Sequence, residues 1–120
     1  LVFQQIKGID GLEAALADAG SRDQPVFLDF YADWCISCKE FEALTFSDPA
    51  VQRALSGVKL IQADVTANDD IDQALMKKLG IFGPPALLFF DRSGVEVKAA
   101  RLVQFMDADK FAEHVQGAVK

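Results

Sequence analysis

The chain has 120 residues, 51% of them hydrophobic, so it is long enough to bury a core without disulfide cross-links and short enough for one domain. A formal net charge of −6, spread along the chain, argues against a nucleic-acid partner, which favours a basic face. No stretch is long and apolar enough to span a bilayer, and no signal peptide is visible. Because the chain starts at Leu1, we expect a processed protein or a domain cut from a longer one.

The first part of the chain predicts a helix, a strand and a second helix. Asp10 begins a capping-box pattern, and the apolar residues that follow at helical spacing end at Gly20. Pro25 then precedes the nearly continuous apolar run Val26–Tyr31, which is typical of a strand covered on both faces. We expect the second helix from about residue 35 to residue 44.

The second part of the chain predicts three helices and three strands. In chain order they are a short helix capped by Asp48, a strand over residues 59–65, a helix marked by Ile71, Leu75 and Leu79 that stops at Gly80, hairpin strands over residues 86–90 and 95–102, and a last helix capped by Asp107. Strands that alternate with helices, followed by a hairpin and a helix, predict a mixed sheet with helices on both faces. The sequence therefore predicts a single α/β domain over residues 1–120.

The two cysteines lie three residues apart, where the strand 26–31 gives way to the next helix. If Cys35 opens that helix, Cys38 lies one turn further on the same face, near enough for the sulfurs to bond. The first N–H groups of the helix point at Cys35 and favour its thiolate, the form that attacks disulfides. This placement predicts reversible dithiol–disulfide exchange but does not identify the redox compartment.

Asp29 interrupts the apolar run, where a buried strand should carry apolar side chains. One interpretation places it on the solvated face of an edge strand. The other, which we favour, makes it a buried acid beneath the cysteines that takes and returns protons during exchange.

Glu42 follows Cys38 by four residues and therefore shares its face on a helix. Since Cys38 is expected to point inward, Glu42 can approach the same pocket as Asp29, and two carboxylates there would raise the thiol pKa values. A solvated glutamate on an amphipathic helix is an equal alternative.

Pro84 and Pro85 lie immediately before the strand expected at residues 86–90. A cis X–Pro bond there would leave backbone groups free to pair with an incoming peptide. X–Pro bonds are far more often trans, so these residues by themselves favour an ordinary loop.

Three motifs together resemble the thioredoxin family in order and spacing: residues 27–35 (FLDFYADWC), residues 38–39 (CK) and residues 83–85 (GPP) before a strand. The resemblance covers almost the whole chain and implies a thioredoxin fold. It implies that Cys35 is the attacking cysteine, Cys38 the resolving one and Pro85 a cis-proline that faces them. It further implies that Trp34 shields the pair and that Asp29 is the family's buried acid.

A closer resemblance is to the C-terminal periplasmic domain of the DsbD family of thiol:disulfide interchange proteins. The segments that carry it are residues 31–35, 38–42, 45–48, 64–69, 88–91 and 105–108. In that family, the domain takes electrons from a transmembrane domain, which cytoplasmic thioredoxin reduces. It passes them to an N-terminal periplasmic domain, which serves disulfide isomerase and cytochrome c maturation.

The DsbD resemblance implies a protein-disulfide reductase on the periplasmic face of the inner membrane, as one domain of a larger membrane protein. The implied partners are the transmembrane and N-terminal domains of the same protein and other protein disulfides. Acids at the positions of Asp29 and Glu42 would tune the active cysteine. No cofactor is expected beyond the Cys35–Cys38 disulfide, and the domain itself is expected to be monomeric and not embedded in the membrane.

The chain departs from the family patterns at three places. Residues 36–37 (IS) replace the Gly-Pro between the cysteines of ordinary thioredoxins, which leaves the reduction potential open. Pro84 and Ala86 change the substrate-facing loop, so partner preference does not carry over. Lys59 is displaced from the lysine that neighbours the buried acid in thioredoxins, which would leave Asp29 less compensated.

Three alternatives remain at this point. A zinc module needs four ligands, and the chain adds only His114, expected as a solvated helix residue, to its two cysteines. An interaction domain with a purely structural disulfide is the second alternative. Within the redox class, the third is a free-standing periplasmic thioredoxin-like reductase, such as those that serve cytochrome c maturation.

Overall fold

The computed structural model describes residues 1–119, and these contain a four-stranded mixed sheet. In their order across the sheet, the strands are β1 (Gln4–Ile6), β3 (Lys59–Asp64), β2 (Val26–Tyr31) and β4 (Ala86–Phe90). β3 runs parallel to β1 and to β2, whereas β4 runs antiparallel to β2. The sequence therefore correctly predicted a mixed sheet, and the structure places the apolar strand β2 inside it, between β3 and β4.

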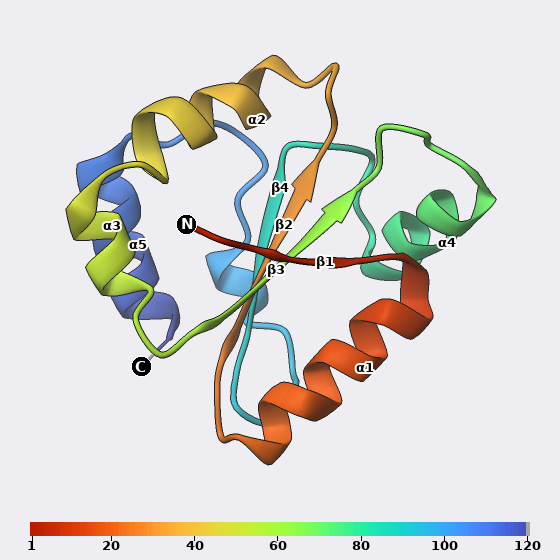
Figure 1. The fold of residues 1–120 in the computed structure, drawn as a ribbon, viewed down its shortest axis with the longest axis horizontal. Helices are drawn as coiled ribbons and strands as arrows, with labels where there is room; N and C mark the ends of the chain where they lie inside the picture. Colours follow the sequence, from red (N-terminus) through yellow and green to blue (C-terminus); the bar gives the residue numbers. More distant parts are fainter. Residues whose placement is uncertain (120) are drawn as a thin grey trace.

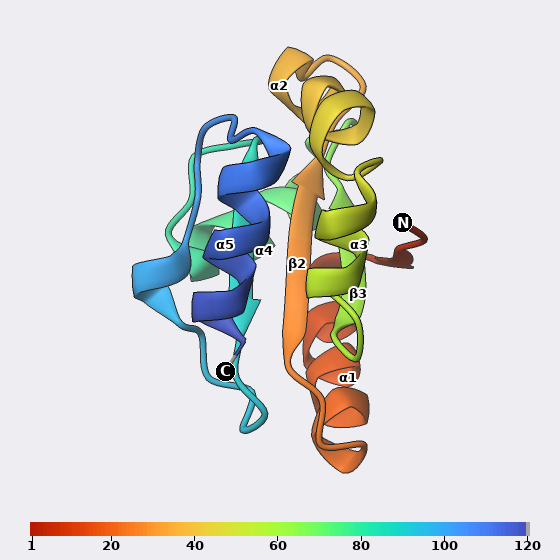
Figure 2. The same ribbon diagram turned by 90° about the vertical axis from the view of Figure 1, so that its left-hand side faces the viewer.

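Helices cover both faces of this sheet (Figure 1). The helices are α1 (Gly8–Ser21), α2 (Ile36–Glu40), α3 (Pro49–Ala54), α4 (Asp70–Leu79) and α5 (Ala108–Ala118), with a π-helical turn η1 (Phe41–Thr45) and a 3-10 turn η2 (Lys98–Ala100). α1 packs with α4 on one side, and α3 packs with α5 on the other. Figure 2, viewed from the side of α3 and α5, shows these two helices side by side in front of the strands. This arrangement is the expected thioredoxin fold.

The core consists of two apolar clusters separated by the sheet. Successive side chains of a strand point to opposite faces, so β2 contributes to both clusters. Leu28 and Phe30 lie in the cluster beneath α1 and α4, and both cysteines join this cluster at the end of the sheet, where the Cys38 sulfur contacts the Phe30 carbonyl oxygen. Phe27 lies in the other cluster and stacks on Phe89, with their ring centroids 4.9 Å apart. By the same alternation, Asp29 lies on the face of Phe27, towards η1, α3 and α5.

The start of the chain differs from the prediction. β1 was not predicted, because three residues with two glutamines carry no strand signal. α1 begins at Gly8 rather than after an N-cap at Asp10, since the positive φ of Gly8 (+69°) lets the chain turn directly from β1 into the helix. Asp10 lies in the first turn, and Gly20 lies inside the helix rather than at its end.

The predicted hairpin is only partly formed. Its turn is present: the Asp91 carboxylate accepts hydrogen bonds from the N–H groups of Ser93 and Val95. Within residues 95–102, however, pairing with β4 is limited to isolated bridges at Glu96 and Leu102, because η2 bends the backbone away between them. The segment therefore lies along β4 without forming a further strand.

The remaining helices agree with their sequence signals. Asp48, Asp69 and Asp107 accept N-terminal N–H groups of α3, α4 and α5. α4 ends at Gly80, in the left-handed conformation, as predicted. Ile71 is nevertheless exposed, and Asp72 is buried in its place because the Lys7 ammonium lies 2.8 Å from its carboxylate.

Among residues 1–119, the structure shows no helix with the length and apolarity needed to cross a bilayer.

Candidate redox site

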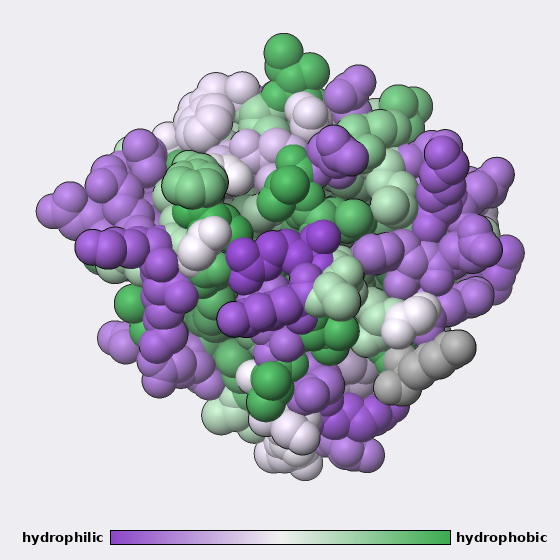
Figure 3. Space-filling model, turned by 180° about the vertical axis from the view of Figure 1, so that it is seen from behind, coloured by the Kyte–Doolittle hydropathy of each residue, from purple (hydrophilic) through white to green (hydrophobic). Residues whose placement is uncertain are grey.

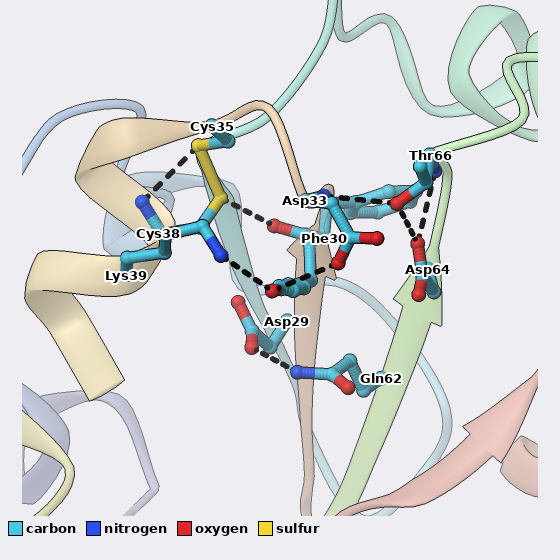
Figure 4. The surroundings of a disulfide bond; sticks show 10 residues. Asp29, Phe30, Asp33, Cys35, Cys38, Lys39, Gln62, Asp64 and Thr66 are labelled. Carbon is cyan, nitrogen blue, oxygen red and sulfur yellow. Dashed lines mark hydrogen bonds between the residues drawn. A yellow bond between two sulfur atoms is a disulfide. The ribbon is translucent and has the colours of Figure 1, made fainter. Parts of the chain in front are cut away.

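The two cysteines form a disulfide at the start of α2 (Figure 4). Cys35 is the N-cap of α2, and its sulfur accepts the Cys38 N–H at 3.1 Å. The Cys38 sulfur lies 3.5 Å from the carbonyl oxygen of Phe30 in β2. Only 5% of Cys35 and 4% of Cys38 is exposed. The helix predicted over residues 35–44 is therefore present, continued by η1, and its first turn donates to Cys35 as expected.

Asp29 lies buried on the central strand, with 4% of its surface exposed, and Figure 4 shows it beneath the disulfide. The solvated edge-strand interpretation was wrong, because β2 is flanked by β3 and β4. Burial raises the pKa of Asp29 from 3.8 to about 7. A hydrogen bond from Gln62 opposes this rise, and the negative charge of Glu42 adds to it. The carboxyl therefore changes protonation near neutral pH, which suits a group that exchanges protons.

Gln62 is a partner of Asp29 that the sequence did not predict. Its Nε2 donates to Asp29 Oδ2 at 2.9 Å, while its Oε1 accepts from Gln5 Nε2 at 2.7 Å. A polar side chain in the predicted strand 59–65 was visible, but its alignment with Asp29 required the strand register. Lys59 is displaced as predicted, since its ammonium binds Asp18 and Gln4 instead.

Glu42 lies in η1 with its side chain exposed, yet its charge acts on Asp29. It lines an open groove of about 600 Å³ together with Gln5, Phe46 and Gln62. The two interpretations of Glu42 are therefore compatible: the side chain contacts solvent, and its field reaches the buried acid.

Replacing Glu42 by Gln should lower the pKa of Asp29 and of the Cys35 thiol in the reduced protein, because a nearby negative charge is removed. Exposed charges interact by no more than about 1 kcal/mol, so we expect Cys35 alkylation near neutral pH to accelerate by less than about fivefold. The pH profile of alkylation measures this. Glu40→Gln removes the same charge from the preceding helix as a control, and an equal effect of both variants would contradict a specific role of Glu42.

The loop before the cysteines is held by Thr66. Its hydroxyl accepts the Asp33 N–H at 2.9 Å, and its carbonyl accepts the Trp34 indole N–H at 3.2 Å. Trp34 is 58% exposed, and the neighbouring apolar side chain of Ile36 is 77% exposed. Figure 3 shows apolar side chains projecting at the end of the molecule where α2 lies in Figure 1. The shielding of the cysteine pair by Trp34, which the family resemblance implies, remains a prediction.

The peptide bond between Pro84 and Pro85 is cis, as the family resemblance implied. Ala86, which follows, pairs with Phe30 at the end of β2. Since the Phe30 carbonyl also contacts the Cys38 sulfur, the two prolines enter the sheet at the end that carries the disulfide. Pro84 and Pro85 line a shallow groove of about 370 Å³ with the fully exposed Phe82.

His114 is partly buried rather than a solvated helix residue. Its Nε2 lies 2.6 Å from the Ala100 carbonyl oxygen, and its ring packs against Phe89 in the α5 cluster. Within the described part of the chain, no three His, Cys, Asp or Glu side chains are grouped so as to hold a metal ion. The arrangement does not place His114 with the cysteines in such a group.

Comparisons with known proteins agree with this geometry. A family model described as thioredoxin-like matches residues 8–92. The thiol:disulfide interchange protein DsbD of Cronobacter sakazakii is 51% identical over all 120 residues. DsbD of Escherichia coli K12 is 53% identical over 97% of the chain. The chain spans about a fifth of the length of these relatives (21% and 20%).

Solved structures place the similarity in one part of those relatives. The oxidised C-terminal domain of Neisseria meningitidis DsbD is 41% identical, with a TM-score of 0.84, and covers 96% of this chain and 99% of its own. A variant thioredoxin from Halobacterium salinarum is 27% identical with a TM-score of 0.68. The described residues thus match a whole DsbD C-terminal domain in extent and in fold.

Proposed function

This chain belongs to the DsbD family of thiol:disulfide interchange proteins, and we propose that it is the C-terminal exchange domain of such a protein, carrying electrons through Cys35 and Cys38. The observation that carries this proposal is the Cys35–Cys38 disulfide at the start of α2, above a buried acid. No further cofactor is required, because the electrons reside in the two sulfurs.

The exchange consists of two thiol–disulfide steps. In the reduced domain, the Cys35 thiolate attacks one sulfur of a partner disulfide, forms a mixed disulfide and releases the other sulfur as a thiolate. Cys38 then gives its proton to Asp29 and attacks Cys35. This second bond releases the partner fully reduced and leaves the domain oxidised, so that two electrons have passed to the partner.

The rest of the proposal follows from family membership. The domain would take electrons from the transmembrane domain of its own protein and give them to the N-terminal domain, on the periplasmic side of the inner membrane. Residues 1–120 would form one monomeric domain of that larger protein, with Trp34, Pro84 and Pro85 in contact with the partner. A carrier that must release each of two partners is suited by interfaces of small buried area.

The reduction potential of the Cys35–Cys38 pair tests the direction of electron flow. We expect a reducing value, nearer the roughly −270 mV of thioredoxin than the roughly −120 mV of a strong oxidant. Equilibration with glutathione at known redox ratios gives this value. An oxidising potential would reverse the proposed flow, and a disulfide that never equilibrates would be a structural one, which would contradict exchange altogether.

A further inference from the structure

A row of side-chain amides crosses the sheet and ends at Asp29. Gln5 on β1, Gln62 on β3 and Asp29 on β2 occupy directly paired positions of three neighbouring strands. Paired residues of adjacent strands project from the same face, so the strand register itself aligns these side chains. Their hydrogen bonds measure 2.7 Å from Gln5 to Gln62 and 2.9 Å from Gln62 to Asp29.

The row has a fixed direction. An ionised carboxylate can only accept hydrogen bonds, so it requires the amide N–H end of Gln62. Gln5 donates to the oxygen end of the same amide, and this contact favours that orientation of Gln62. If Gln62 were flipped, its oxygen would face the Asp29 carboxylate and its own N–H groups would face the Gln5 N–H groups.

The surroundings of Asp29 leave Gln62 without a charged competitor. On β4, the residue paired with Asp29 is the apolar Leu87, and Lys59 of β3 binds Asp18. Among the charged groups of the covering helices, Glu42 of η1 is the one whose charge acts on Asp29. Lys39 of α2 places its ammonium 3.5 Å from the Tyr31 hydroxyl instead. The other ionisable side chains on these helices, none of which donates to Asp29 among the described hydrogen bonds, are Glu40 of α2, Arg53 of α3, and Asp109, Lys110, Glu113 and His114 of α5. Among residues 1–119, Gln62 is the side chain that donates to Asp29.

We propose that Gln62 is a positioning residue for Asp29 and that Gln5, at the exposed edge of the sheet, fixes its orientation. A neutral donor stabilises the carboxylate but leaves it able to bind a proton, whereas an ammonium at the same place would hold it ionised. The row therefore sets how readily Asp29 takes the proton of Cys38. This inference rests on the proposed exchange function.

Gln62→Leu tests the first contact. Losing one hydrogen bond to a charged group should weaken Asp29 as an acid by about tenfold or more. Carbon-13 NMR of the Asp29 carboxyl in the oxidised protein measures this without any substrate. The pH profile for resolution of a preformed mixed disulfide should move to higher pH by the same amount. An unchanged Asp29 titration would overturn the proposal.

Gln5→Glu tests the second contact at an exposed position, where folding is not at risk. A carboxylate at residue 5 accepts from Gln62 and favours the flipped amide, so Asp29 should again become a weaker acid. Gln4→Glu adds the same charge one residue away, beside the Lys59 ammonium, and should shift the titration of Asp29 by less. Equal shifts in the two variants would overturn the role of Gln5.

The two readouts separate this inference from the function on which it rests. If the Asp29 titration moves in Gln62→Leu but the resolution profile does not, the positioning role in exchange is overturned while exchange stands. If the unsubstituted protein forms no mixed disulfide at all, the proposed function fails, whatever the titration of Asp29.

Discussion

A Cys38→Ala variant should stop after the first exchange step and accumulate as a mixed disulfide with its partner. Cys35 can still attack, but no second sulfur is present to displace the partner. We expect multiple-turnover reduction of a disulfide peptide to fall by roughly a thousandfold or more, the scale seen when a catalytic nucleophile is removed. Mass spectrometry under non-reducing conditions should show one covalent adduct per chain.

The matched variant Cys35→Ala should form no adduct, although Cys35 and Cys38 are almost equally buried in the oxidised protein. The asymmetry lies in their environments rather than in their exposure. The Cys35 sulfur accepts a helix N–H, which favours its thiolate, whereas the Cys38 sulfur faces the Phe30 carbonyl oxygen, which does not. Ser37→Ala serves as a control in the same turn. Adduct formation by Cys35→Ala would reverse the assigned roles.

The sequence predicted those parts of the site that are local in the chain. The two cysteines, the strand before them and the capped helix after them follow from spacing and apolar pattern over residues 26–44. The burial of Asp29 was also predictable, because its neighbours on both sides of the run are apolar. Gln62 was not, because its role depends on the register between β2 and β3, which residues 33 positions apart establish only in the folded protein.

Short elements held by tertiary contacts were likewise beyond the sequence. β1 exists because it pairs with β3, and its glutamines give no strand signal. Residues 95–102 carry an alternating pattern, yet η2 interrupts their pairing with β4, and an ion pair joins Arg101 to Glu96 on either side of η2. The residues alone left Glu42 undecided, and only the family resemblance assigned it to tuning the cysteine, because exposure and electrostatic influence are separate properties and Glu42 has both.

Asp29→Asn should make the oxidised protein more stable above pH 7, although the substitution removes the proposed proton acceptor. The folded protein keeps the Asp29 proton up to about pH 7, whereas the ordinary value for the carboxyl is 3.8. Between these pH values the folded state binds the extra proton, so the free energy of unfolding decreases as pH rises and levels off above pH 7. Asparagine does not titrate, and its side-chain oxygen can still accept from Gln62.

The stabilisation of Asp29→Asn over the unsubstituted protein should be larger at pH 8 than at pH 4, by roughly 4 kcal/mol as an upper limit. This limit takes about 1.4 kcal/mol for each pH unit between the pKa values of 3.8 and about 7. Urea unfolding of the oxidised protein at several pH values measures it, as the difference between Asp29→Asn and the unsubstituted chain. Glu113→Gln removes an exposed carboxylate from α5 and should show no such pH-dependent gain. If the Asp29→Asn difference is constant from pH 4 to pH 8, the carboxyl is not held protonated by burial, and Asp29 cannot act as the proton acceptor for Cys38. A stability gain accompanied by slower resolution of the mixed disulfide would instead identify Asp29 as a residue kept for exchange at the expense of stability.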